Sequence, residues 1–178
     1  MARKSRIDAP GALHHIIARG IERSKILRDD TDRNNFLEQL SGILKESSTL
    51  CFAWSLIPNH LLLRTGDVPI ATVMRRLLTG YAVFHSRRHR RSGHLFQNRY
   101  KSILCQEDTY LLELVRYIHL NPIRAGILKD MKALDRYPYT GHSALMGKIN
   151  GDWQAIEWVL RLFDHRQWPA SLKVSSIC

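Results

Sequence analysis

The sequence predicts an α+β fold in which strands and helices alternate ahead of a helical C-terminal part. Short runs rich in branched apolar residues, bounded by proline, glycine or asparagine, are typical of strands. Longer segments between them carry apolar residues at helical spacing. The order is strand, helix, strand, strand, helix, strand, helix. The first six elements form a split βαβ pattern, which predicts a ferredoxin-like sandwich. In such a sandwich the first and third strands lie in mid-sheet, helices cover one face, and we expect the other face to be open to a ligand.

The first half of the chain supplies a strand, a helix and a hairpin. Residues 12–19, ALHHIIAR, form the first predicted strand. Asp30 can cap the helix that follows. Residues 51–57 and 60–65 are the second and third strands, and the break at Pro58 joins them as a hairpin.

The second half adds a helix, a strand and a further helix. Pro69 suits the first turn of a helix whose pattern extends to Arg91. Residues 100–105 are the fourth predicted strand. Asp108 can cap the next helix.

We predict a domain boundary near residue 128, because the regular patterns weaken beyond it. Residues 10–128 form the main domain, and residues 129–178 form a short helical C-terminal extension. Within the extension, residues 153–163 have the periodicity of an amphipathic helix.

The chain is strongly basic, with 27 Lys and Arg against 16 Asp and Glu and a net charge of +11 in 178 residues. Such an excess favours a polyanionic partner, with nucleic acid ahead of an acidic membrane surface. No apolar run approaches the roughly 18 residues of a membrane span, and no signal peptide is evident. The three separated cysteines fit neither a disulfide framework nor a cysteine zinc site. We therefore expect a protein of the reducing cytoplasm.

Much of the positive charge falls in the second predicted helix and the segment after it. Arginine contacts phosphates, and the interleaved aromatic residues can stack on unpaired bases. A helix end that contacts only solvent is the alternative, because cations also favour helix C-termini. The cations that we expect to bind DNA are Arg75, Arg76, Arg87, Arg88, Arg90, Arg91, Arg99 and Lys101.

A tyrosine lies one helical turn before an asparagine in the third predicted helix. The Tyr117 hydroxyl could attack a phosphodiester if a metal ion or a base assists it. Asn121 is four residues on, so we expect both side chains to leave the helix on one face, at the edge of the core. A tyrosine that only packs in the core is the alternative at this position.

Four segments together resemble the single-tyrosine HUH transposases, in particular the REP-associated tyrosine transposases of the IS200-like group. They are residues 12–20, 57–60, 93–100 and 117–126. The resemblance implies an HUH domain that cuts and rejoins hairpin-forming single-stranded DNA through a 5′-phosphotyrosine intermediate. It also implies a bacterial protein that works at the nucleoid. Some members exchange helices between subunits, so a homodimer is one assembly to test.

The resemblance also assigns roles to residues of this chain. Tyr117 matches the nucleophile, and His60 and Asn121 match ligands of a divalent metal, Mg²⁺ or Mn²⁺. The family has a second histidine two residues after the first, whereas this chain has Leu62 there. Either Leu62 replaces that histidine, or two residues were lost from the strand. One ligand is missing in both cases, and we expect impaired activity unless His14 or His15 on the first strand compensates.

The sequence leaves two other functions open. One is a catalytically inactive DNA-binding regulator of repeat elements, which keeps the fold and the basic surface. The other is a ferredoxin-like RNA-binding protein, although the aromatic glycine-rich strand motif of RNA recognition domains is missing. A zinc site at His85, His89 and His94 is disfavoured, because no nearby cysteine or acid completes the ligand set.

Overall fold

The structure is a computed structural model that describes residues 9–57, 59–105 and 107–165 of the chain. Pro58, the expected turn residue, and the tail from residue 166 lie outside the described residues. The strands are β1 (Leu13–Ile17), β2 (Leu50–Leu56), β3 (Asn59–Arg64) and β4 (Lys101–Cys105). The longer helices are α1 (Asp30–Glu46), α2 (Ile70–Arg88), α3 (Glu107–His119) and α7 (Ile156–His165). The short helices are a 3₁₀ turn (Ile21–Arg23), α4 (Asn121–Arg124), α5 (Met131–Leu134) and α6 (Gly141–Leu145).

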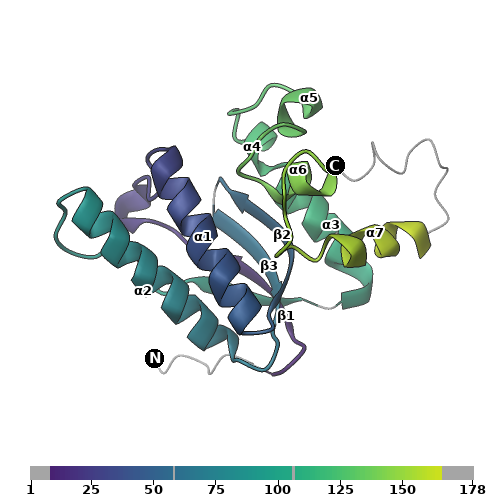
Figure 1. The fold of residues 1–178 in the computed structure, drawn as a ribbon, viewed down its shortest axis with the longest axis horizontal. Helices are drawn as coiled ribbons and strands as arrows, with labels where there is room; N and C mark the ends of the chain where they lie inside the picture. The colour runs from purple at the N-terminus through teal and green to yellow at the C-terminus, as the bar shows by residue number, and fades with distance from the viewer. Residues whose placement is uncertain (1–8, 58, 106, 166–178) are drawn as a thin grey trace.

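The four strands form one antiparallel sheet in the order β2-β3-β1-β4. The predicted ferredoxin-like arrangement is therefore confirmed, with β1 and β3 in mid-sheet (Figure 1). In the β1–β3 register, Ile17 lies opposite His60 and His15 lies opposite Leu62. Directly paired residues place their side chains on the same face of a sheet, so this register decides which groups can meet.

Helices α1 and α2 lie side by side over one face of the sheet (Figure 1). Their apolar stripes bury Phe36, Leu40 and Leu77 against the strands. The hydroxyl of the buried Tyr81 donates to the carbonyl of Ile26 at 2.5 Å. Each fully buried side chain of this size contributes on the order of 1.5–3 kcal/mol, so this layer supplies much of the driving force for folding.

The expectation of an open second face is wrong over β2 and β3, where α3 covers the sheet. Leu111, Val115 and Ile118 recur at helical spacing, and this stripe must be buried against something. It packs on Phe52 and Leu62, with residues of α7 completing the cluster.

The same face stays accessible at β4. Lys101 and Ile103 lie opposite Ile17 and His15 of β1, and both β4 side chains are exposed.

The C-terminal segment packs along β2, the edge strand that α3 also covers. Thr140 forms a bridge with Ser55, and Gln154 forms one with Cys51. The indole of Trp54 donates to Gln154 at 2.9 Å. Residues beyond 128 thus share the core of the main domain, and the proposed boundary there stays a prediction.

Several element ends differ from the predicted ones for local reasons. Asp29, not Asp30, caps α1, because its side chain accepts the N–H of Asp32 at 3.0 Å. Helix α3 begins at Glu107, so Asp108 falls inside it. Helix α7 begins at Ile156 instead of residue 153, because the backbone at Gln154 and Ala155 pairs with Cys51 of β2. Among the described residues, none of the helices combines the length and apolar character needed to cross a membrane.

Candidate active site and nucleic-acid interface

Tyr117 lies in the last turn of α3, beside two histidines of the sheet. Its ring centroid is 5.9 Å from that of His60 and 6.2 Å from that of His15. The side chain is 40% exposed, so its hydroxyl end can meet a ligand from solvent. Arg124 of α4 places its guanidinium 5.0 Å from the Tyr117 ring centroid. The structure therefore brings Tyr117 and His60 together on one side of the sheet, as the sequence predicts.

His15 and His60 form a buried pair on the neighbouring strands β1 and β3. His15 Nε2 lies 2.8 Å from His60 Nδ1, and the ring centroids are 5.0 Å apart. Burial, followed by the charges of His15 and Arg19, lowers the pKa of His60 to about 4. Burial and the charge of Lys101 also lower the pKa of His15. Both rings are therefore neutral at pH 7, which is the form that binds metal ions.

Leu62 occupies the position two residues after His60, on the same face of β3. It is fully buried in the apolar cluster beneath Leu111 and Val115 of α3. Its cross-strand neighbour is His15. An imidazole therefore stands directly opposite the position where the family pattern puts the second histidine. Sequence reasoning admitted His15 only as one of two candidates, because the register that selects it appears only in the folded sheet.

Asn121 is placed differently from the expectation of a shared helix face. Helix α3 ends at His119, and Asn121 is the first residue of the short helix α4. Pro122 has no N–H to continue the helical hydrogen bonding, which explains the break. Tyr117 is exposed whereas Asn121 is only 5% exposed. The Nδ2 atom of Asn121 is buried and has no hydrogen-bond partner among the described residues.

Two of the predicted DNA-binding cations are held by acids of the chain itself. Arg88 donates to Asp29 and Asp32, with distances of 2.6–2.9 Å. Arg76 forms an ion pair with Glu46. Their guanidinium groups are therefore less available to a phosphate than an unpaired cation would be.

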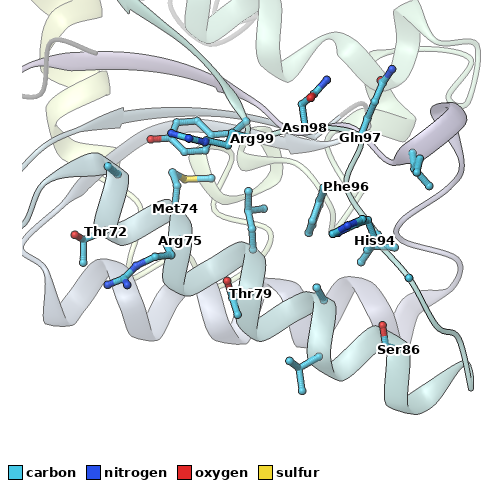
Figure 2. A pocket seen from close by; sticks show the side chains of 18 of the residues that line it. Thr72, Met74, Arg75, Thr79, Ser86, His94, Phe96, Gln97, Asn98 and Arg99 are labelled. Atoms are coloured by element: carbon cyan, nitrogen blue, oxygen red, sulfur yellow. The ribbon is translucent and has the colours of Figure 1, made fainter. Parts of the chain in front are cut away.

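Other predicted cations line a groove between α2 and the segment of residues 93–100 (Figure 2). The groove has a volume of about 1060 Å³, and Arg75, Arg87 and Arg99 lie along it. Figure 2 shows Phe96 between the helix and this segment. The arrangement offers an aromatic ring among cations, which is the combination that single strands need.

A smaller hollow of about 190 Å³ connects this groove to the Tyr117 side of the sheet. Its lining includes Ile17, Arg19 and Lys101. It shares Gln97, Asn98 and Arg99 with the larger groove. Ile17, which lines this hollow, lies directly opposite His60 in the β1–β3 register. Arg90, which is exposed, and Arg91, which donates to the His94 carbonyl at 3.3 Å, lie in the loop beside the large groove.

A further basic hollow of about 580 Å³ was missed from the sequence. Its cations are Arg19, Arg23, Lys25, Arg28 and Arg33. Their clustering over fifteen residues was a usable signal, although acids between them mask it in a simple charge count. Asn59, the residue before His60, also lines this hollow, which therefore adjoins the same end of the sheet.

The expectation that no acid accompanies the histidines of α2 is wrong. Asp32 of α1 lies with His85 and His89 in a group whose ligand atoms are all within 4.8 Å of one another. His94 instead lines the large groove. Asp32 is more than fifty residues away in the sequence, so only the packing of α1 on α2 reveals it.

Comparison with known proteins gives the family. The sequence profile of the family described as "Transposase IS200 like" matches residues 10–121. The chain therefore belongs to the IS200-like transposase family. A solved structure of a REP-associated tyrosine transposase bound to a REP hairpin is similar, with a TM-score of 0.66 and 16% sequence identity. The match covers 89% of this chain and 91% of that chain. At this identity the likeness concerns the fold. No curated protein matches the chain.

Proposed function

We propose that this protein is a single-tyrosine transposase that cuts and rejoins hairpin-forming single-stranded DNA. The observation that supports it best is the meeting of Tyr117, His60 and His15 beside a cationic surface. Membership of the IS200-like family supports a DNA transposase. The similar solved structure holds a REP hairpin, which supports a hairpin as the substrate here.

In the proposed reaction Tyr117 is the nucleophile. Its hydroxyl oxygen forms a bond to the scissile phosphorus while the bond from phosphorus to the 3′ oxygen breaks. The phenol loses its proton, and the departing 3′ oxygen gains one. Tyr117 is then linked to the 5′ phosphate, and a free 3′ hydroxyl reverses the step when it attacks the same phosphorus. Arg124, beside the Tyr117 ring, supplies a cation near the phosphate throughout.

The residues around Tyr117 fit a divalent metal. His60 and His15 are neutral imidazoles, and Asn121 has a buried amide end that no other described residue contacts by a hydrogen bond. Which end of that amide is oxygen depends on a half-turn of the side chain, so the unpartnered end can offer an acceptor. Imidazole suits Mn²⁺ better than Mg²⁺, which prefers oxygen ligands, and we therefore favour Mn²⁺. When bound, the metal would polarise the scissile phosphate.

We assign His15 to the role of the missing second histidine. It reaches the site from β1, opposite Leu62, instead of from β3. If His60 donates its Nδ1 proton to His15, the Nε2 atom of His60 keeps a lone pair for the metal. If a metal replaces that proton, both rings become ligands. His15 supports metal binding in both arrangements. In the first it acts through His60, so its support is less direct than that of a metal-binding histidine at position 62.

The same geometry suggests a path for the DNA strand. Cations that have no ion pair within the described part of the chain run from the large groove, past Arg99, into the small hollow at Arg19 and Lys101. Because Ile17 of this hollow lies opposite His60, and His60 lies beside Tyr117, a strand that follows the cations is directed toward Tyr117. Phosphate contacts of this kind position the strand without reading its sequence.

A second function is supported by Leu62 itself. A fully buried leucine at the position of a metal ligand also suits an inactive DNA-binding regulator of repeat elements, which keeps the fold and the cations. The two functions predict the same binding and differ in covalent chemistry.

End-labelled hairpin DNA separates them. The protein is incubated with Mn²⁺ and a hairpin labelled at its 3′ end or, in a matched reaction, at its 5′ end. The transposase function predicts that the 3′ label becomes linked to protein while the 5′ label is released on a shorter strand. An inactive regulator shifts both labelled hairpins in a binding gel and links neither.

A further inference from the structure

The α1–α2 layer holds a second cluster of metal-binding side chains, away from Tyr117. Asp32 lies in the first turn of α1, His85 in the last turn of α2, and His89 directly after that helix. The start of α1 and the end of α2 lie at the same end of the layer (Figure 1), and Arg88 and His89 contact Asp32 there. His89 Nε2 is 3.0 Å from each carboxylate oxygen of Asp32. The His85 and His89 ring centroids are 4.3 Å apart.

His85 is the unexplained member of this cluster. It is fully buried, and neither ring nitrogen has a hydrogen-bond partner among the described residues. Buried polar side chains are nearly always partnered, so a histidine with two unpartnered nitrogens points to a group that is not part of the chain. Its ring lies beside Tyr81 and His89, at centroid distances of 5.9 Å and 4.3 Å.

The spacing of the three groups suits a small tetrahedral ion. Ligands about 2.0–2.1 Å from a zinc ion are about 3.3 Å from one another. The 3.0 Å between His89 and Asp32 is close to this value, and all ligand atoms fall within 4.8 Å. An ion would replace the proton between His89 and Asp32, and a small movement of the rings would add His85.

The charges around the cluster leave a place for a cation. Burial raises the pKa of Asp32, but hydrogen bonds from the Arg28 N–H, His89 and Arg88 outweigh it and hold the pKa below its usual range. Arg88 is shared between Asp29 and Asp32, so two carboxylates face one guanidinium. Burial, His89, Arg28 and Arg91 lower the pKa of His85 against the opposing effect of Asp32, and the ring is neutral at pH 7.

We propose that Asp32, His85 and His89 bind a divalent transition metal, with Zn²⁺ as the best match. Two imidazoles and one carboxylate are a donor set that Zn²⁺ accepts and Mg²⁺ does not favour. The ion ties the start of α1 to the end of α2. It thereby fixes the base of the loop that carries Arg90 and Arg91 beside the large groove. Its role is structural, and it lies across the sheet from Tyr117.

The test uses untagged, full-length protein that carries His60→Ala, so that the Tyr117 site does not contribute metal. The protein is stripped with a chelator, incubated with Zn²⁺, desalted and measured for bound zinc and for Tm. We expect about one zinc per chain, and a Tm that rises with free zinc because the ion binds only the folded state. Adding His85→Ala and His89→Ala should lower the apparent zinc affinity by at least about 100-fold.

His94→Ala in the same background is the matched control and should keep the zinc, since His94 lies outside the cluster. Should the alanine variants fail to fold, Co²⁺ added to the His60→Ala protein gives a second readout. A tetrahedral cobalt spectrum that zinc then bleaches supports the site. The proposal is overturned if the His60→Ala protein retains no zinc and shows no zinc-dependent Tm, or if the variants at positions 85 and 89 retain zinc as well as the control does.

Discussion

The two histidine clusters of this protein are built from the same side chain and differ in what surrounds it. At the first, His15 and His60 meet a half-exposed tyrosine, and the cations Arg19 and Lys101 lie nearby. At the second, His85 and His89 meet the buried carboxylate of Asp32. The first cluster lies beside a cationic surface that suits a polyanion. The second is closed around a buried carboxylate, which suits a structural role.

The comparison shows that neighbouring charge and access, not the histidines alone, decide what a cluster can do. A phosphate can approach Tyr117 because Tyr117 is exposed and the cations Arg19, Lys101 and Arg124 lie on its side of the sheet. It has no such path to His85, which is fully buried. Variants at the two clusters should therefore have separate effects, on DNA chemistry at one and on folding at the other.

The largest expected difference is between the salt dependence of hairpin binding and the salt dependence of Tm. Six of the eight predicted DNA-binding cations have no ion pair among the residues that the structure describes, whereas Arg76 and Arg88 are held by acids. If each contacts a phosphate, raising salt from 50 to 200 mM should weaken hairpin binding by about 10³-fold. The Tm should change little over the same range, because the buried Asp32 is poorly screened. Fluorescence anisotropy and thermal melts measure the two quantities, and a flat binding curve contradicts the cationic path.

The next largest effect concerns folding. Asp32→Asn removes the charge from a fully buried carboxylate that Arg88 and His89 contact, and should cost about 3 kcal/mol in the free energy of unfolding. Asp30→Asn is the matched control, because its ion pair with Arg33 is exposed and is worth about 0–1 kcal/mol. Urea melts in the presence of a chelator measure both. Equal effects of the two substitutions would show that the cluster does not stabilise the α1–α2 contact.

An exchange of residues between strands tests the role of His15. His15→Leu should lower the rate of adduct formation by on the order of 10–100-fold, the usual effect of losing a group that supports a metal ligand. Adding Leu62→His returns an imidazole to β3 and should recover activity, because positions 15 and 62 face each other. His14→Leu is the control, since its side chain points to the other face. Unchanged activity in His15→Leu would remove His15 from the site.

The smallest expected effect is the difference in salt slope between an arginine that lines the groove and an arginine that an acid already holds. Arg99 lines both the large groove and the small hollow, so Arg99→Ala should reduce the salt slope of hairpin binding by about 1. Arg76→Ala should leave the slope nearly unchanged, because Glu46 already holds that guanidinium. Equal slopes for the two variants would place the DNA elsewhere on the surface.

The order of strands and helices follows from local patterns, which depend on periodicity and on a known arrangement of six elements. The approach of Tyr117 to His60 was expected from the family resemblance, which implies that both residues belong to one site. The features that were missed depend on contacts between distant segments. Asp32 joins His85 and His89 only when α1 packs on α2. The choice of His15 over His14 depends on strand register, which the sequence leaves open.

The other differences between the predictions and the structure also come from contacts between distant segments. The apolar stripe of α3 was visible in the sequence, but its position over β2 and β3 was not, and the second face was therefore expected to be open. The break before Pro122 was likewise visible as a helix end. The break buries Asn121 and leaves Tyr117 exposed. The sequence does not show this, because it depends on the direction in which α4 leaves α3.

The most direct test of the proposed reaction is to locate the covalent link itself. The protein is incubated with hairpin DNA and Mn²⁺, treated with nuclease and protease, and its peptides are sequenced by mass spectrometry. We predict a nucleotide phosphate on Tyr117, its loss in Tyr117→Phe, and its retention in Tyr137→Phe. A link on another residue, or an adduct that survives Tyr117→Phe, would contradict the account.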